Sequence, residues 1–260
     1  MKFKTHIPNI LTLLNLLAGI IAVMLAVSDR LVEAALFVLI GILFDFFDGL
    51  LARILNVQAE LGKQLDSLAD VVTSGVVPGI VMFQLFKRSS HKDWMDGLSC
   101  EIGNWVVFEE TAMISLTDSK IHLLPFVGLL LSLAAAYRLA NFNIDERQIS
   151  SFIGLPTPAM ALFILSLPVI LIYGENEFIN NLILNKYILI AIVVIFSILM
   201  NAEIPLFALK FKNFSLKKNA IEVFFLLILI LLLIVLDFVA VPIIILLYVL
   251  FSIIKNVVKN

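Results

Sequence analysis

The stretch from residue 45 to residue 70 reads D-F-F-D-G-L-L-A-R-I-L-N-V-Q-A-E-L-G-K-Q-L-D-S-L-A-D. It carries two pairs of acids, Asp45 with Asp48 and Asp66 with Asp70. A helix turns by about 100° per residue, so each pair falls on one face of its own helix. A turn around residues 56–61 joins the two helices, and antiparallel packing of this helix pair would bring the four carboxylates together.

The residues around this stretch are far more apolar than those of a soluble protein. Hydrophobic residues make up 62% of the 260 residues and charged residues 15%, against about 45–50% and 25% in soluble domains. The composition therefore predicts a membrane protein. The formal net charge of -2 gives no sign of a nucleic-acid partner.

Apolar runs near the length that crosses a bilayer, about 17–25 residues, predict about eight membrane helices in one all-α domain of residues 1–260. The expected spans are residues 9–27, 34–55, 62–86, 123–143, 157–173, 187–201, 220–236 and 238–254. The long polar interruption at residues 87–122 is expected to form an extramembrane insertion. Its role is left open by the sequence.

The positions of lysine and arginine predict the orientation of the helices, because basic residues in short loops are retained in the cytoplasm. If the N-terminus is inside, most basic residues lie in inner segments, whereas the short outer loops hold Arg30 and Lys186. We therefore expect both termini and the four aspartates to face the cytoplasm.

Four carboxylates in a membrane need polar surroundings, since one charged side chain at the centre of a bilayer costs about 2.5–3.5 kcal/mol on insertion scales. Gathered together they would repel one another unless cations were present. Oxygen ligands at this density suit a hard divalent ion such as Mg²⁺ or Mn²⁺. The histidines lie elsewhere and Cys100 is the single cysteine, so the sequence gives no support for a zinc site.

The small residues beside the acids indicate a second property of the two helix faces. Gly49 and Gly62 have no side chain and Ala52 has only a methyl group, so the phosphates of a ligand could approach the helix backbones closely. Arg53 supplies a permanent positive charge suited to phosphate. An alternative without an active site is that the acids pair with basic residues or line a proton path, as in a transporter.

The spacing of these residues resembles the CDP-alcohol phosphotransferase signature, D-x2-D-G-x2-A-R-x8-G-x3-D-x3-D. Every fixed position of the signature is matched, by Asp45, Asp48, Gly49, Ala52, Arg53, Gly62, Asp66 and Asp70. A chance match at so many positions is negligible, so the resemblance favours an enzyme over a transporter.

The resemblance implies a core of about six membrane helices and a reaction in which an alcohol attacks a CDP-linked donor and releases CMP. It implies that Asp45, Asp48 and Asp66 bind divalent metal, as a pair of ions of the two-metal type. Asp70 would complete the metal site and act as general base. Contacts to the CDP donor are implied for Asp48, Gly49, Ala52, Arg53, Gly62 and Asp66, and a homodimer is implied as well.

Four further stretches look like the serine-accepting branch of that family: residues 8–15, 137–143, 152–159 and 201–212. The likeness implies transfer of the phosphatidyl group of CDP-diacylglycerol to the hydroxyl of L-serine in a prokaryotic cytoplasmic membrane, with Arg138 and Asn143 as acceptor contacts. Asn141 departs from the branch, which typically has arginine there. Other acceptors therefore stay open, namely glycerol 3-phosphate, inositol phosphate or choline.

Overall fold

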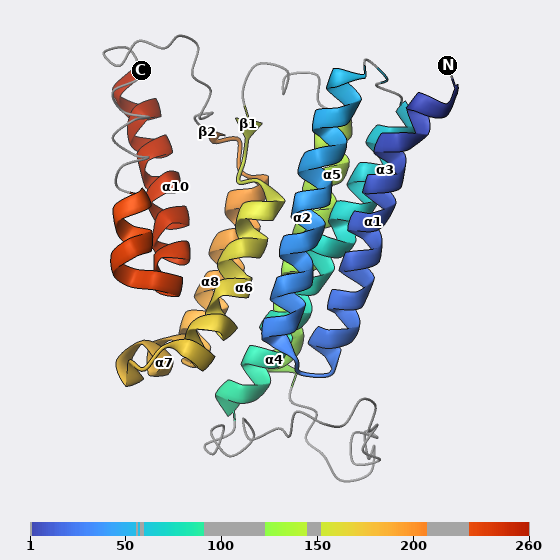
Figure 1. The fold of residues 1–260 in the computed structure, drawn as a ribbon. Helices are drawn as coiled ribbons and strands as arrows, with labels where there is room; N and C mark the ends of the chain where they lie inside the picture. The colour runs from blue at the N-terminus through green and yellow to red at the C-terminus, as the bar shows by residue number, and fades with distance from the viewer. Residues whose placement is uncertain are drawn as a thin grey trace.

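The structure is a computed structural model that describes residues 2–55, 57, 60–90, 123–144, 152–206 and 229–259. In these ranges the chain is almost entirely helical, and long helices run side by side in a bundle (Figure 1). An all-α membrane bundle was expected, and it is confirmed. Residues 91–122 of the expected extramembrane insertion lie outside the described ranges.

The first half of the chain forms a tightly packed group of helices. It consists of α1 (Lys2–Val27), α2 (Leu31–Ile54), α3 (Glu60–Asp70), a π-helical segment η1 (Val71–Val76) and α4 (Val77–Ser90). Helices α3 and α4 with η1 form one apolar span, Glu60–Ser89. Helix α4 thus continues through the first residues of the expected insertion. The end of the bundle at which α2 ends and α3 begins is called the carboxylate end below.

The second half adds helices on the other side of α2 and α4. It consists of η4 (Leu124–Leu129), α5 (Leu130–Ile144), α6 (Thr157–Tyr173), α7 (Glu177–Ile183), α8 (Lys186–Asn201), η6 (Asp237–Val239) and α10 (Ala240–Lys259). Side-chain caps by Asn176 and Asn185 begin α7 and α8, because an asparagine oxygen accepts the free N–H groups of a first turn. Helices α7 and α8 meet at an angle of 61°.

Five of the described helical stretches are long and apolar enough to cross a membrane, or six if the bent pair α7–α8 forms one span. Helix α6 is a shorter apolar helix that coincides with the predicted span 157–173. The two spans expected at 220–236 and 238–254 correspond to the apolar stretch Leu229–Ile254, which is interrupted at η6. Residues 220–228 lie outside the described ranges, so the expected total of eight spans stays a prediction.

A short pair of strands was not expected from the sequence. Strand β1 (Phe152–Ile153) pairs antiparallel with β2 (Pro205–Leu206), and the backbone N–H of Leu155 donates to Leu199. Because β1 precedes α6 and β2 follows α8, these hydrogen bonds tie the start of α6 to the end of α8.

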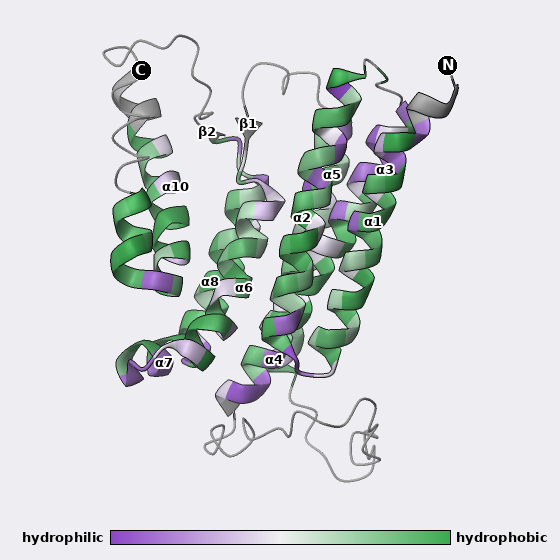
Figure 2. Ribbon diagram, in the orientation of Figure 1, coloured by the Kyte–Doolittle hydropathy of each residue, from purple (hydrophilic) through white to green (hydrophobic). Residues whose placement is uncertain are grey.

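Small side chains explain why α1 and α2 pack so closely. Ala18, Ala22 and Ala26 of α1 are buried at four-residue spacing, and Ala34 and Ala35 of α2 are buried as well. Small residues on one face let two membrane helices approach. The outward faces are apolar instead, as Figure 2 shows, which fits contact with lipid because hydrocarbon offers no partner to polar groups.

Candidate metal and CDP-donor site

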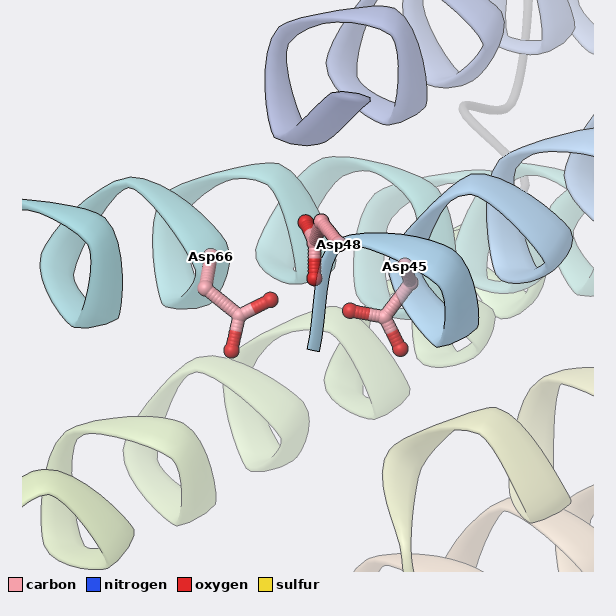
Figure 3. Close-up of side chains that lie close together, drawn as sticks. All are labelled: Asp45, Asp48 and Asp66. Atoms are coloured by element: carbon pink, nitrogen blue, oxygen red, sulfur yellow. The ribbon is translucent and has the colours of Figure 1, made fainter. Parts of the chain in front are cut away.

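Two helices bring the paired acids together near the carboxylate end. Asp45 and Asp48 project from α2 and Asp66 projects from α3, and one carboxylate oxygen from each lies within 4.8 Å of the other two. Figure 3 shows these three side chains turned toward a common space between the helices. The expectation that an antiparallel pair would gather the acids is confirmed for these three aspartates.

Asp70 lies one turn further along α3, outside this group of three carboxylates. Its Oδ1 accepts a hydrogen bond of 3.4 Å from Nδ2 of Asn15 on α1. Asp70 also interacts electrostatically with Asp66 and with Arg138. The acid is therefore held by α1 and α3 at the border between the carboxylate group and α5.

Helix α1 supplies hydrogen-bond donors that the signature does not contain. Thr12 donates to Oδ2 of Asp48 at 2.5 Å, so the threonine and asparagine of α1 each hold one aspartate of another helix. Thr12 and Asn15 are both buried. Their spacing of three residues within the otherwise apolar stretch 10–27 of α1 is the signal from which sequence reasoning could have assigned them to the site.

The carboxylate group fits a bound cation on its own chemistry. Asp45, Asp48 and Asp66 repel one another through their like charges. The Oδ1 atom of Asp66 is buried and accepts no hydrogen bond from any described residue. A buried oxygen without a partner is costly, and a divalent cation would both satisfy it and offset the repulsion. The three aspartates are therefore positioned to bind a metal.

The two glycines of the signature differ in the space beside them. Among the described residues, a Cβ atom on Gly49 would meet only Nη2 of Arg53 within 4 Å, at 3.8 Å. A Cβ atom on Gly62 would lie 3.3 Å from Oδ1 of Asn9, so α1 passes close to this part of α3. The side chain of Arg53 is exposed, and its Nε donates to the carbonyl of Gly49 at 2.9 Å. The face of α2 around Gly49 is open to a ligand, and Arg53 lies beside it.

The two predicted acceptor residues lie on α5, facing α3. Arg138 is buried, and its Nε has no hydrogen-bond partner in the described part of the chain. Asn143 donates through Nδ2 to Ser67 at 2.8 Å, and its backbone carbonyl accepts from Lys63 at 2.8 Å. The Oδ1 atom of Asn143 is buried without a partner among the described residues. Both side chains thus keep polar atoms available beside α3.

Hydrogen bonds between α5 and the α3–η1 segment fix where Arg138 lies. Asn143 bonds to Ser67 at one point, and Ser132 donates to the carbonyl of Gly75 at 3.0 Å at another. The two helical segments therefore run antiparallel, and Arg138 falls between these points, at the level of Asp70. Asn141, which departs from the expected pattern, is exposed.

Comparison with known proteins agrees with this arrangement of residues. The family model described as CDP-alcohol phosphatidyltransferase matches residues 5–199. The chain belongs to this family. The matched range contains the four aspartates, the donors of α1, and both predicted acceptor residues, so the family assignment covers the whole candidate site.

Several members of the CDP-alcohol phosphatidyltransferase family are similar to this chain. A CDP-diacylglycerol–serine O-phosphatidyltransferase of Bacillus subtilis (strain 168) is 30% identical over 178 residues, covering 65% of this chain and 81% of the relative. A protein of the same name from Methanocaldococcus jannaschii is 27% identical and covers 72% and 68%. Another from Helicobacter pylori (strain 26695) is 25% identical over 251 residues and covers 95% and 90%.

Proposed function

We propose that this chain transfers the phosphatidyl group of CDP-diacylglycerol to the hydroxyl of L-serine, which yields phosphatidylserine and CMP. The observation that carries the proposal is the meeting of the signature aspartates in one place, in a chain that resembles serine O-phosphatidyltransferases over most of its length. The transporter alternative is not favoured, because it gives no reason for the match of residues 5–199 to a transferase family.

Asp45, Asp48 and Asp66 would hold divalent metal, Mg²⁺ or Mn²⁺, as a pair of ions with Asp70 completing the site. When bound, the metal neutralises phosphate charge and favours departure of CMP. Gly49, Ala52 and Gly62 would let the nucleotide and its pyrophosphate lie against α2 and α3, and Asp48 and Asp66 would line the same space. Arg53 is beside Gly49 and can turn from its own backbone to a phosphate.

Asp70 would act as the general base. In this reaction the serine hydroxyl oxygen forms a bond to the phosphorus that carries diacylglycerol, and the bond from that phosphorus to the oxygen of CMP breaks. The proton of the hydroxyl passes to the Asp70 carboxylate. The position of Asp70 between the carboxylate group and Arg138 supports this role, since donor and acceptor would meet there.

Arg138 and Asn143 would contact the acceptor. A buried guanidinium whose Nε–H has no partner among the described residues suits the carboxylate of an amino acid. The Oδ1 atom of Asn143, likewise without a partner among those residues, suits an ammonium group. Two of the alternative acceptors lack one of these groups. Choline has no carboxylate for Arg138, and glycerol 3-phosphate has no ammonium group for Asn143.

The remaining parts of the proposal concern the cell. The chain is a multi-pass membrane protein. We infer that it lies in a prokaryotic cytoplasmic membrane as a homodimer, with both termini and the carboxylate end in the cytoplasm. Basic residues such as Lys63 at this end support the orientation. Labelling of Lys63→Cys in a protein that also carries Cys100→Ser, from either side of the membrane, tests it, with labelling from the cytoplasmic side expected.

Release of CMP by the purified protein tests the reaction. The protein is supplied with CDP-diacylglycerol, Mn²⁺ or Mg²⁺, and in parallel L-serine, glycerol 3-phosphate, inositol phosphate or choline. We expect release with serine alone, loss of release on chelation, and no release by Asp66→Asn. If CMP were released only with another alcohol, that alcohol would be the acceptor in place of serine. Transport of an ion without any release of CMP would contradict the proposal as a whole.

A further inference from the structure

A polar contact between three helices lies directly behind Asp70. Thr73 of η1 donates through Oγ1 to Oδ1 of Asn15 at 2.9 Å, and Asn15 in turn donates through Nδ2 to Asp70 at 3.4 Å. The Thr73 hydroxyl also lies 3.3 Å from the backbone carbonyl of Asn15. Both Asn15 and Thr73 are fully buried. The proposed reaction does not use either of them.

The direction of these hydrogen bonds gives Asn15 one orientation. A carboxylate can only accept, so the amide must turn its NH₂ group toward Asp70. The Oδ1 atom then faces Thr73, whose hydroxyl donates to it. Without that hydroxyl, the amide oxygen would be buried with no donor, and rotation of the amide would place an acceptor against Asp70.

The backbones of α1 and α2 pass close to this pair. A Cβ atom on Gly41 of α2 would lie 2.7 Å from Oδ1 of Asn15 and 2.8 Å from Cγ2 of Thr73. A Cβ atom on Gly19 of α1 would lie 2.5 Å from Oγ1 of Thr73. Glycine at both positions therefore lets α1, α2 and η1 close around the pair, which restricts its rotamers.

Thr73 lies in a π-helical segment that directly follows Asp70. Segment η1 begins at Val71, immediately after Asp70, and its last hydrogen bond runs from Val77 N–H to the carbonyl of Val72. A π turn contains one more residue than an α turn and so rotates the following side chains relative to the preceding ones. Such turns are frequent at functional sites. Asp70 and Thr73 are three residues apart, so they lie near one face of this continuous helical stretch and bond to the same asparagine.

We propose that Asn15 and Thr73 are positioning residues that hold the Asp70 carboxylate in place, with Thr73 acting through Asn15. The inference rests on the proposed function in so far as Asp70 is the general base. Neither residue belongs to the signature that defines the metal and donor site. The role is to orient a base, so loss of either residue should slow turnover rather than weaken donor binding.

Single and double variants of the full-length protein test the pair. Thr73→Val keeps the shape of the side chain and removes the hydroxyl, and we expect kcat to fall by about tenfold or more with the KM for CDP-diacylglycerol unchanged. Thr73→Ser restores the hydroxyl and should restore most of kcat. Because Thr73 acts through Asn15, the double variant Asn15→Ala/Thr73→Val should be no slower than Asn15→Ala alone.

Ser252→Ala serves as the matched control, since Ser252 is also fully buried and its hydroxyl donates to the backbone carbonyl of Tyr248 on its own helix. Its kcat should equal that of the original protein. The inference would be overturned if Thr73→Val kept the full kcat. It would also be overturned if the two single-variant losses of kcat multiplied in the double variant, or if Thr73→Ser did not restore kcat. All ratios are taken with whichever acceptor supports CMP release, so an error in the acceptor changes the proposed function and leaves this test intact.

Discussion

Replacing Gly41 by alanine is expected to destabilise the protein, because the space for the added methyl group is already occupied. The methyl carbon would lie 2.7 Å from Oδ1 of Asn15 and 2.8 Å from Cγ2 of Thr73. Ordinary contacts between non-bonded carbon atoms are about 3.5–4.0 Å. Helix α2 must therefore move away from α1 and η1 by roughly 0.7–1 Å, or the two polar side chains must leave their positions.

The size of the effect follows from the cost of overpacking a buried site, about 1–3 kcal/mol. For a chain of this size each kcal/mol lowers the midpoint of thermal unfolding by about 2–4 °C. We expect a decrease of about 2–12 °C for Gly41→Ala in detergent, followed by intrinsic fluorescence. Turnover should fall as well, since the methyl group displaces Asn15 from Asp70.

Gly49→Ala is the matched control on the same helix. The new methyl group would meet only Nη2 of Arg53, at 3.8 Å, and alanine is the better helix former by about 1 kcal/mol. The midpoint of Gly49→Ala should thus equal or exceed that of the original protein. Equal midpoints for Gly41→Ala and Gly49→Ala would refute the close contact of the three helices at Gly41.

Further substitutions separate the roles proposed for the site. Asp66→Asn removes a charge from the carboxylate group and should weaken Mn²⁺ binding by about tenfold or more, measured by electron paramagnetic resonance; unchanged affinity would remove Asp66 from the metal ligands. Asp70→Asn should abolish CMP release while the unfolding midpoint is kept, and retained activity would exclude it as the base. Arg138→Lys should raise the KM for serine and leave the KM for CDP-diacylglycerol unchanged, because lysine lacks the paired N–H groups of arginine; equal shifts in both constants would contradict an acceptor contact. Gly49→Leu should weaken donor binding, measured as competition by CDP, and unaltered competition would argue against a nucleotide packed there.

Features that depend on neighbouring residues in the chain could be predicted from the sequence. The apolar run at 157–173 has the bounds of α6, and the spacing of Asp45 and Asp48 placed both acids on one face of α2. Hydrophobic length and helical periodicity are local properties, so they need no knowledge of tertiary packing. The meeting of Asp66 with the acids of α2 followed from the short connection between the two helices.

Features that depend on contacts between distant segments were missed. The bend between α7 and α8 falls where Asn185 caps the start of α8. The β1–β2 pair joins the segment before α6 to the segment after α8. The π-helical turn after Asp70 was not expected, since the sequence predicted one helix over residues 62–86. Thr73 was not assigned to the site because its role depends on a contact with Asn15 of α1, and that contact arises only from the packing of the helices.

The donors of α1 change how the signature itself should be understood. The signature supplies carboxylates on α2 and α3, and these carboxylates repel one another when no metal is bound. Thr12 holds Asp48 of α2 and Asn15 holds Asp70 of α3, so a single helix fixes acids on both of its neighbours. The two donors are three residues apart on α1, so one turn of this helix contacts an acid of each neighbour. The geometry of the site is thus determined jointly by the signature and by two residues of α1 outside it.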